Sequence, residues 1–278
     1  MWDRSLPFLF SCLMDMVLIT IEEDIRERQE CSMRGKWRLH HYYLKDSTIA
    51  RYLPDTAIFN RTTLQQFLSR YMEIYVKPNL EHMGKGIIKV WKQNQQYAYV
   101  KVSGKLTFVS SLNLLYKRLS ALTGTQSYLV QKGIPLAKLA GRSYDIRVMM
   151  MRGGSNEWQY AGMLAKVAGP GSVITNINRG KGYVTTVRRA LTRSLNLNQQ
   201  QVDQVENTLI RLSHRICERF RGIKYSSQIG IDFGIDQQQK IWVIEINFDY
   251  PSHELFNKMS DKSYYRRIKY LKRMYQRR

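Results

Sequence analysis

The amino-acid sequence predicts an α+β protein made of two lobes, each with its own helices and antiparallel strands. Segments with apolar residues at helical spacing alternate with short apolar or period-2 segments typical of strands. The 278 residues suffice for two lobes around substantial cores, and 44% hydrophobic residues exclude a disordered chain. A Gly-Ile-Pro break at 133–135 interrupts a strand pattern, and we expect a hinge there.

The first lobe is expected over residues 59–132. It opens with a helix capped near Asn60 or Thr62. The apolar stripe of this helix consists of Leu64, Phe67, Leu68 and Tyr71. Strands are expected at about 73–77, 86–92 and 96–102. A second amphipathic helix follows in "SSLNLLYKRLSAL", with Ser110 as its expected cap.

The second lobe is expected over residues 133–255, after the strand in "SYLVQKGIPL". Two long strands, "YDIRVMMMR" and "EWQYAGMLAKVA", should pair antiparallel across a short link. A Gly/Asn-rich loop at 169–182 leads to a long helix, and the strands "SQIGIDFGID" and "KIWVIEIN" close the lobe. The apolar stripe of the long helix consists of Val202, Val205, Leu209, Leu212, Ile216 and Phe220.

Three further segments are assigned separately. Residues 33–58 form a lead-in segment, and 256–278 form a basic amphipathic tail that is expected to dock on its own domain. Residues 1–32 are expected to be an extension outside the fold, because the better-patterned sequence begins at Met33. The apolar run "SLPFLFSCLMDMVLIT" is too short, and too interrupted by Asp15, to span a membrane.

Composition points to an anionic partner. Lys and Arg number 44 against 22 Asp and Glu, a net charge of +22. Nucleotide phosphates, an anionic polymer, nucleic acid or a membrane surface would each qualify. The five histidines have no metal-ligand spacing, and the three cysteines form no paired pattern, so we expect a reducing, cytoplasmic location.

The strongest chemical signal is "IGIDFGIDQQQKIWVIEIN". Asp232 lies in an apolar strand, and Glu245 and Asn247 lie two residues apart on the next strand, hence on one face. If the strands form a hairpin, the three oxygen-bearing side chains converge. Oxygen ligands of this kind suit Mg²⁺. The alternative is that both acids only pair with arginines at the sheet edge.

A second signal lies in "YVKPNLEHMGKGIIKV". Lys77 at a strand end can neutralise phosphates, and a turn of Gly84, Lys85 and Gly86 can offer backbone N–H groups to them. This signal is weak alone, because the spacing is not that of a P-loop and no G-x-G-x-x-G opens a helix.

In order, these segments resemble the ATP-grasp superfamily: "YVKP", a glycine loop, "YLVQKGI", "YDIRV", "VITNINRG" and "GIDFGID…WVIEIN". Within it, "MRGKW", "YLPDT", "VQKGI", "DIRVMM" and "TNINRG" resemble the YheC/YheD-type branch, which is associated with endospore coats. The resemblance covers about residues 33–255. It implies two α+β lobes that hold ATP between antiparallel sheets.

The resemblance also implies roles for residues at the small-lobe side of the site. Lys77 would hold the α- and β-phosphates, and Arg61 would approach from the first helix. The hinge strand, residues Gln131, Lys132, Gly133 and Ile134, would bind adenine through its backbone. This sequence departs from the superfamily at Lys132, where many members carry glutamate.

On the large-lobe side, Asp145 would face the nucleotide and Arg147 would contact the γ-phosphate. Asn176 and Arg179 would orient phosphate or substrate. The implied cation ligands are Asp232, Glu245 and Asn247, which would hold one or two Mg²⁺, with Mn²⁺ as an alternative.

Two functional hypotheses follow. The first is an ATP-dependent carboxylate–amine or carboxylate–thiol ligase that forms an acyl phosphate from an unidentified carboxylate substrate. The second is an ATP-binding structural or assembly protein of the spore coat, with little or no turnover, whose basic surface holds anionic polymer or coat material. The intact metal ligands favour the ligase. Larger ATP-grasp ligases carry a substrate domain ahead of the segment that corresponds to residue 59, and its lack here favours the second hypothesis or a substrate supplied by a partner. A specific nucleic-acid binder is not predicted, because no aromatic-basic RNA motif is present.

Overall fold

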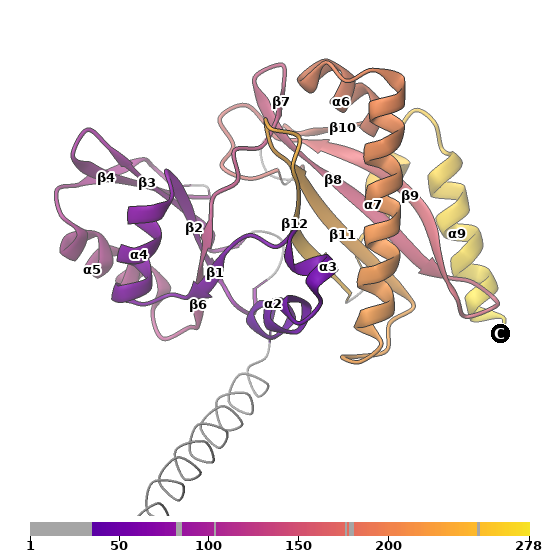
Figure 1. Cartoon of the computed structure of the whole chain (residues 1–278), viewed down its shortest axis with the longest axis horizontal. Coiled ribbons are helices and arrows are strands. Elements are labelled where there is room, and N and C mark those ends of the chain that lie inside the picture. Colours follow the sequence, from indigo (N-terminus) through magenta and orange to yellow (C-terminus); the bar gives the residue numbers. More distant parts are fainter. Residues whose placement is uncertain (1–34, 82–84, 103, 176, 178–180, 249–250) are drawn as a thin grey trace, which may run out of the picture.

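The computed structural model describes residues 35–81, 85–102, 104–175, 177, 181–248 and 251–278. Within these ranges two lobes lie side by side, each built on one antiparallel sheet (Figure 1). The predicted α+β class is thus confirmed. The predicted extension at 1–32 lies outside the described residues, as do Gly84, Asn176 and Arg179. No helix in the described part of the chain is long and apolar enough to cross a membrane.

The small lobe has six strands in the order β1-β6-β2-β3-β4-β5, with helices α4 and α5 packed on one face. The strands are β1 (Thr56–Ile58), β2 (Glu73–Pro78), β3 (Ile88–Gln93), β4 (Gln96–Lys101), β5 (Thr107–Val109) and β6 (Tyr128–Lys132). The helices are α4 (Arg61–Arg70) and α5 (Leu112–Thr123). The sequence analysis did not predict β1 and β5, which are only three residues long.

Side-chain caps determine where the two small-lobe helices begin. Asn60 caps α4 by accepting the Thr63 N–H, and the Thr63 hydroxyl accepts the Asn60 N–H in return. The cap of α5 is Ser111, whose hydroxyl accepts the Leu114 N–H, so the prediction of Ser110 was one residue early.

The large lobe has a sheet in the order β10-β9-β8-β11-β12, with β7 paired to β8. Its strands are β7 (Lys138–Leu139), β8 (Arg142–Arg152), β9 (Trp158–Val167), β10 (Tyr183–Thr185), β11 (Gln228–Ile235) and β12 (Ile241–Asn247). Its helices are α6 (Val187–Leu195), α7 (Gln199–Phe220), α8 (Glu254–Asn257) and α9 (Ser263–Gln276). The predicted antiparallel pairings of β8 with β9 and of β11 with β12 are both present.

Helices cover both faces of the large sheet (Figure 1). On one face α7 buries its predicted apolar stripe, from Val202 to Phe220, against alternate residues of β8 and β11. On the other face the tail helix α9 packs Ile268 and Leu271 against Met149 and Met151 of β8. The basic tail therefore docks on its own lobe, with its charged side chains outward.

The lead-in segment connects the two lobes. It forms α2 (Lys36–Leu44) and α3 (Ser47–Ala50), neither of which was predicted. The Lys36 N–H donates to the Asn79 carbonyl of the small lobe, and the Tyr43 hydroxyl donates to the Ile216 carbonyl of α7. Residues 36–50 thus contact both lobes and form one wall between them.

Candidate functional site

A bulge in β12 places two acidic residues face to face. Phe233 of β11 is opposite Val243 of β12, whereas the preceding residue, Asp232, is opposite Glu245. Ile244 is therefore the extra residue of the bulge. Directly opposed residues of an antiparallel pair share a face, so Glu245 lies on the face of Asp232 and away from the Val243 core.

Charged residues continue across the sheet from this pair. Asp232 is also opposite Arg147 of β8, and Asp145, two residues earlier, is opposite Lys166 of β9. Arg147 and Met149 are two residues apart on β8 and therefore share a face, and Met149 packs against α9. The four charged residues thus lie on the face of the sheet that α9 covers farther along. Neighbouring strands thus present one row of charged side chains from Lys166 to Glu245.

The row is a buried ion-pair network. Arg147 donates from Nε and Nη2 to the two Asp232 carboxylate oxygens, at 2.6 and 2.8 Å. Lys166 Nζ lies 3.0 Å from Oδ1 of both Asp145 and Asp232. None of these four residues is more than 9% exposed. Asn247 Nδ2 donates to Asp232 Oδ2 at 3.4 Å.

The two buried aspartates have opposite pKa shifts. Burial raises the pKa of Asp145, and the nearby Asp232 charge adds to that effect, which Lys166 and the Thr175 hydroxyl bond only partly offset. Burial also acts to raise the pKa of Asp232, but Arg147 and Lys166 outweigh it and hold that pKa below the usual range. Asp232 is therefore the more readily ionised carboxyl group of the two.

The sequence analysis missed Lys166. A lysine inside the apolar segment "YAGMLAKVA" is the signal that could have found it, since an unpaired lysine rarely lies in a buried strand. Gly230 also belongs to this site: a Cβ there would lie 3.3 Å from Arg147 Cδ and 2.8 Å from Pro251 Cβ. The missing side chain leaves room for the Arg147 side chain.

Lys77 approaches from the small lobe. Ile74 and Val76 of β2 face the small-lobe core, so Lys77 points to the opposite face, where its Nζ donates to Gln131 Oε1 at 2.8 Å. Burial lowers the pKa of Lys77 to about 8; Glu245 counteracts this effect and Lys36 adds to it. An anion placed beside the Lys77 amine would therefore stabilise its protonated form.

Lys77 and Glu245 line one cavity of about 60 Å³ between the lobes. Lys36 at the start of α2 lies there too, with its Nζ 3.4 Å from Glu245 Oε1, and was not predicted. The other residues around the cavity are Leu39, His40, Tyr43, Leu53, Pro54, Thr56, Leu129, Gln131, Val243, Ile244 and Ile246. Burial, together with Lys77, lowers the pKa of His40 to about 3, so its imidazole is neutral.

Several backbone groups that were expected to bind adenine already form hydrogen bonds within the protein. The Lys132 N–H donates to the Asp55 carbonyl and the Gly133 N–H donates to the Glu73 carbonyl, at 2.9 and 2.8 Å. Gly133 lies so close to β2 that a Cβ would be 2.6 Å from the Glu73 oxygen. The Ile134 carbonyl accepts the Leu136 N–H. Adenine recognition here would require other groups of the hinge.

The remaining predicted residues lie farther out. Arg61 is the first residue of α4 and donates to Asn113 Oδ1 at 2.7 Å, so the structure does not bring it to the cavity that Lys77 lines. Lys85 is exposed, and Gly86 has φ +73°, a conformation that favours glycine.

The donor set at the end of β12 suits a hard cation. Asp232, Glu245 and Asn247 offer two carboxylates and an amide oxygen, the ligand types of Mg²⁺. Nowhere in the described ranges do three His, Cys, Asp or Glu side chains converge as a metal-binding group. The Asp232 oxygens already accept from Arg147 and Lys166, and a carboxylate has lone pairs for a further ligand.

Comparisons with known proteins agree with this architecture. The chain is 23% identical over 228 residues to the endospore coat-associated protein YheD of Bacillus subtilis (strain 168), covering 80% of this chain and 49% of that protein. It is 24% identical over 217 residues to the endospore coat-associated protein YheC of the same strain, covering 76% of this chain and 58% of YheC. The chain thus spans about half the length of these curated relatives.

The fold is similar to that of D-cycloserine synthetase DcsG, a solved structure with a TM-score of 0.50 and 14% sequence identity. The match covers 84% of this chain and 69% of that chain, and it bears on the fold alone. The family model for YheC/D-like ATP-grasp proteins matches residues 29–276. The chain belongs to the YheC/D-like ATP-grasp family, as its sequence motifs predicted.

Proposed function

We propose that this protein binds ATP between its lobes with one or two Mg²⁺ ions and uses it to activate a carboxylate. The observation that supports this most directly is that Lys77 of the small lobe and Glu245 of the large lobe line one cavity. A cation from one lobe then faces a carboxylate from the other, an arrangement suited to holding phosphates together with a metal ion.

Asp232, Glu245 and Asn247 would hold the Mg²⁺, which neutralises charge on the β- and γ-phosphates when bound. Lys77 would bind the α- and β-phosphates. Asp232 holds the Arg147 guanidinium through hydrogen bonds, and the missing side chain at Gly230 leaves room for it. Arg147 would direct this guanidinium to the charge that develops on the γ-phosphoryl group. Lys166 would keep Asp232 ionised and positioned.

In the proposed reaction a substrate carboxylate oxygen attacks the γ-phosphorus, and the bond from that phosphorus to the β-phosphate oxygen breaks to release ADP. An amine or thiol then attacks the acyl carbon, loses its proton and displaces phosphate. The acyl phosphate must be protected from water. The Tyr75 hydroxyl, which donates to the Val173 carbonyl at 3.4 Å, joins the small lobe to the loop after β9 and would help close the site.

One observation favours the second candidate, an ATP-binding assembly protein of the spore coat. Asp232 is already neutralised by Arg147 and Lys166, so the network is electrically balanced without a bound cation. The relatives' names support an association with the spore coat. Exposed basic side chains would then hold anionic coat material.

The deciding experiment measures ADP release from Mg-ATP with a panel of amino acids, peptides and cell-wall fragments, with the product mass determined. Substrate-dependent ADP release with a condensed product supports the ligase. Nucleotide binding without turnover across the panel supports the assembly protein. Absence of nucleotide binding contradicts both.

A further inference from the structure

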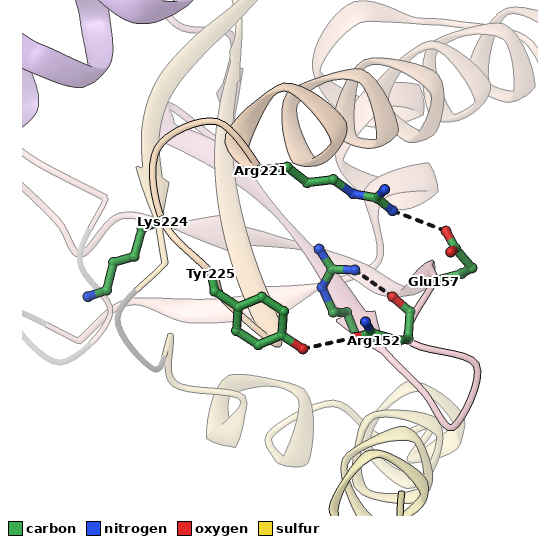
Figure 2. Close-up of a pocket in the computed structure, with 6 residues that line it drawn as sticks. Arg152, Glu157, Arg221, Lys224 and Tyr225 are labelled. Atoms are coloured by element: carbon green, nitrogen blue, oxygen red, sulfur yellow. Dashed lines mark hydrogen bonds and ion pairs between the residues drawn. The ribbon is translucent and has the colours of Figure 1, made fainter.

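A second, larger cavity of about 280 Å³ lies at the far end of the large lobe (Figure 2). It is formed by the β8–β9 turn and by the segment that follows α7. Its lining residues are Arg152, Asn156, Glu157, Arg221, Lys224 and Tyr225. The lining thus includes three basic side chains and one carboxylate.

Arg152 is the central feature of this cavity. It is the last residue of β8 and only 4% exposed, yet no carboxylate of the described residues forms an ion pair with it. Nε donates to the Ser226 carbonyl at 3.0 Å, and Nη1 donates to the Asn156 carbonyl. The guanidinium carbon lies 4.3 Å from the Trp158 ring centroid and 5.3 Å from that of Tyr225.

The backbone carbonyls and the two rings orient this guanidinium without neutralising it. A buried charge without a counter-ion is costly, and buried arginines are normally paired. The second guanidinium of the cavity differs: Arg221 is about half-exposed and is paired with Glu157 and Glu218, each at 3.2 Å. An anion in the cavity would supply the counter-charge that Arg152 lacks among the described residues.

The cavity is separate from the nucleotide site. Arg152 is five residues along β8 from Arg147, about 17 Å at the rise of an extended strand. An odd spacing places the two side chains on opposite faces of the sheet. Met150, which shares the Arg152 face, packs in the core that α7 covers, whereas Met149, on the Arg147 face, packs in the core under α9.

We propose that this cavity, the Arg152 pocket, binds the phosphoryl group of a small phosphate-bearing molecule. The guanidinium groups of Arg152 and of Arg221, at the end of α7, both lie at the cavity, and the Tyr225 hydroxyl beside them donates to Asn156 Oδ1 at 2.9 Å (Figure 2). Donors from several directions match a tetrahedral phosphoryl group better than a planar carboxylate. The volume is about nine times that of a water molecule in the liquid, which leaves room for the rest of a phosphomonoester.

The test is calorimetric titration of the full chain with orthophosphate, glycerol 3-phosphate and succinate. We expect both phosphates to bind, and succinate to bind at least tenfold more weakly. Tighter binding of glycerol 3-phosphate identifies an ester, and equal binding identifies free phosphate. Binding of succinate with equal affinity would overturn the proposed phosphoryl specificity.

Variants locate the site. Arg152→Gln and Arg221→Gln should each weaken phosphate binding about tenfold or more, the loss expected for a charge-assisted contact. Glu157→Gln should strengthen it, because the only lining carboxylate becomes neutral. Arg211→Gln, on the exposed side of α7, is the control and should leave phosphate binding unchanged.

Wild-type affinity in Arg152→Gln, or a loss in Arg211→Gln equal to the loss in Arg152→Gln, would contradict the proposal. If Arg152→Gln does not fold, Arg221→Gln and Glu157→Gln decide the question through their opposite effects. Failure of ATP binding in other assays leaves this test intact, since Arg152, Arg221 and Glu157 all lie outside the cavity between the lobes.

Discussion

Glu245 of β12 stands directly opposite Asp232 of β11, although Val243, two residues before it, stands opposite Phe233 on the other face of the sheet. The Ile244 bulge causes this change of face. An unbroken strand would have kept Glu245 on the face of Val243 and turned it into the α7 core. The proposed cation site therefore exists because of one extra residue in the strand.

Glu245→Gln tests the proposed cation site. The substitution removes a charge and keeps the size, so ATP turnover should be abolished, while ADP affinity should stay within about tenfold, roughly 1.4 kcal/mol. Coupled ADP-release assays and calorimetry measure the two effects. The control is Glu254→Gln on the exposed surface of α8. Full turnover in Glu245→Gln would show that this strand pair does not hold the metal.

Lys77 should make nucleotide binding dependent on pH. Burial lowers its pKa to about 8, so the ammonium is charged below that pH and loses its proton above it. ADP affinity should be constant from pH 6 to about 7.5 and then fall by up to about tenfold per unit above 8. Lys77→Arg should remove the fall, and Lys77→Met should bind weakly at every pH. A wild-type profile that stays flat to pH 9.5 would contradict the assignment.

The same lowered pKa predicts an effect on folding. The unfolded chain retains the Lys77 proton up to about pH 10.4, whereas the folded chain releases it near 8. The Lys77 contribution to the unfolding free energy should therefore rise with pH across this interval. Urea denaturation of wild type and Lys77→Met at pH 7, 8.5 and 10 measures it. The stability difference in favour of Lys77→Met should shrink as pH rises, and a difference that grows would exclude a buried ammonium.

Lys166 is expected to be essential for stability. Lys166→Met removes the cation between Asp145 and Asp232 and should cost about 3–5 kcal/mol at pH 7. Without Lys166 the buried carboxylates have raised pKa values and take up protons on folding as pH falls. The deficit should therefore be largest near pH 7 and smaller near pH 5. Lys138→Met, at the exposed residue of β7, is the control for loss of a lysine and should change stability by less than about 0.5 kcal/mol.

The basic face of α9 should bind polyanions independently of nucleotide. Arg266, Arg267 and Arg273 are exposed and Lys272 is half-buried, while Ile268 and Leu271 hold the helix on the sheet. Replacing the four basic residues with Gln should weaken binding to RNA or polyglutamate and flatten its salt dependence. ADP affinity should not change. A loss of ADP binding would place the tail within the nucleotide site.

Helices α4, α5, α7 and α9 and the long strands could be predicted from local pattern, whereas α2, α3, α6 and α8 were not. The stripe of α7 and the strand pairs β8–β9 and β11–β12 follow from apolar periodicity, which reflects which side of an element is buried. The motifs also indicated the family that the comparisons confirmed. Short strands such as β1 and β5 carry too few residues for a periodic signal, and tertiary hydrogen bonds alone define them.

The sequence by itself determined that Asp232, Glu245 and Lys77 are chemically unusual, because charged residues in apolar strands require a partner. Only the tertiary structure decided which partners they have. The pairing of Asp232 with Arg147 and Lys166 depends on the register of three strands, and the approach of Lys77 to Glu245 depends on how α2 joins the lobes. Register and lobe packing arise from contacts between residues far apart in the chain, which local periodicity does not encode.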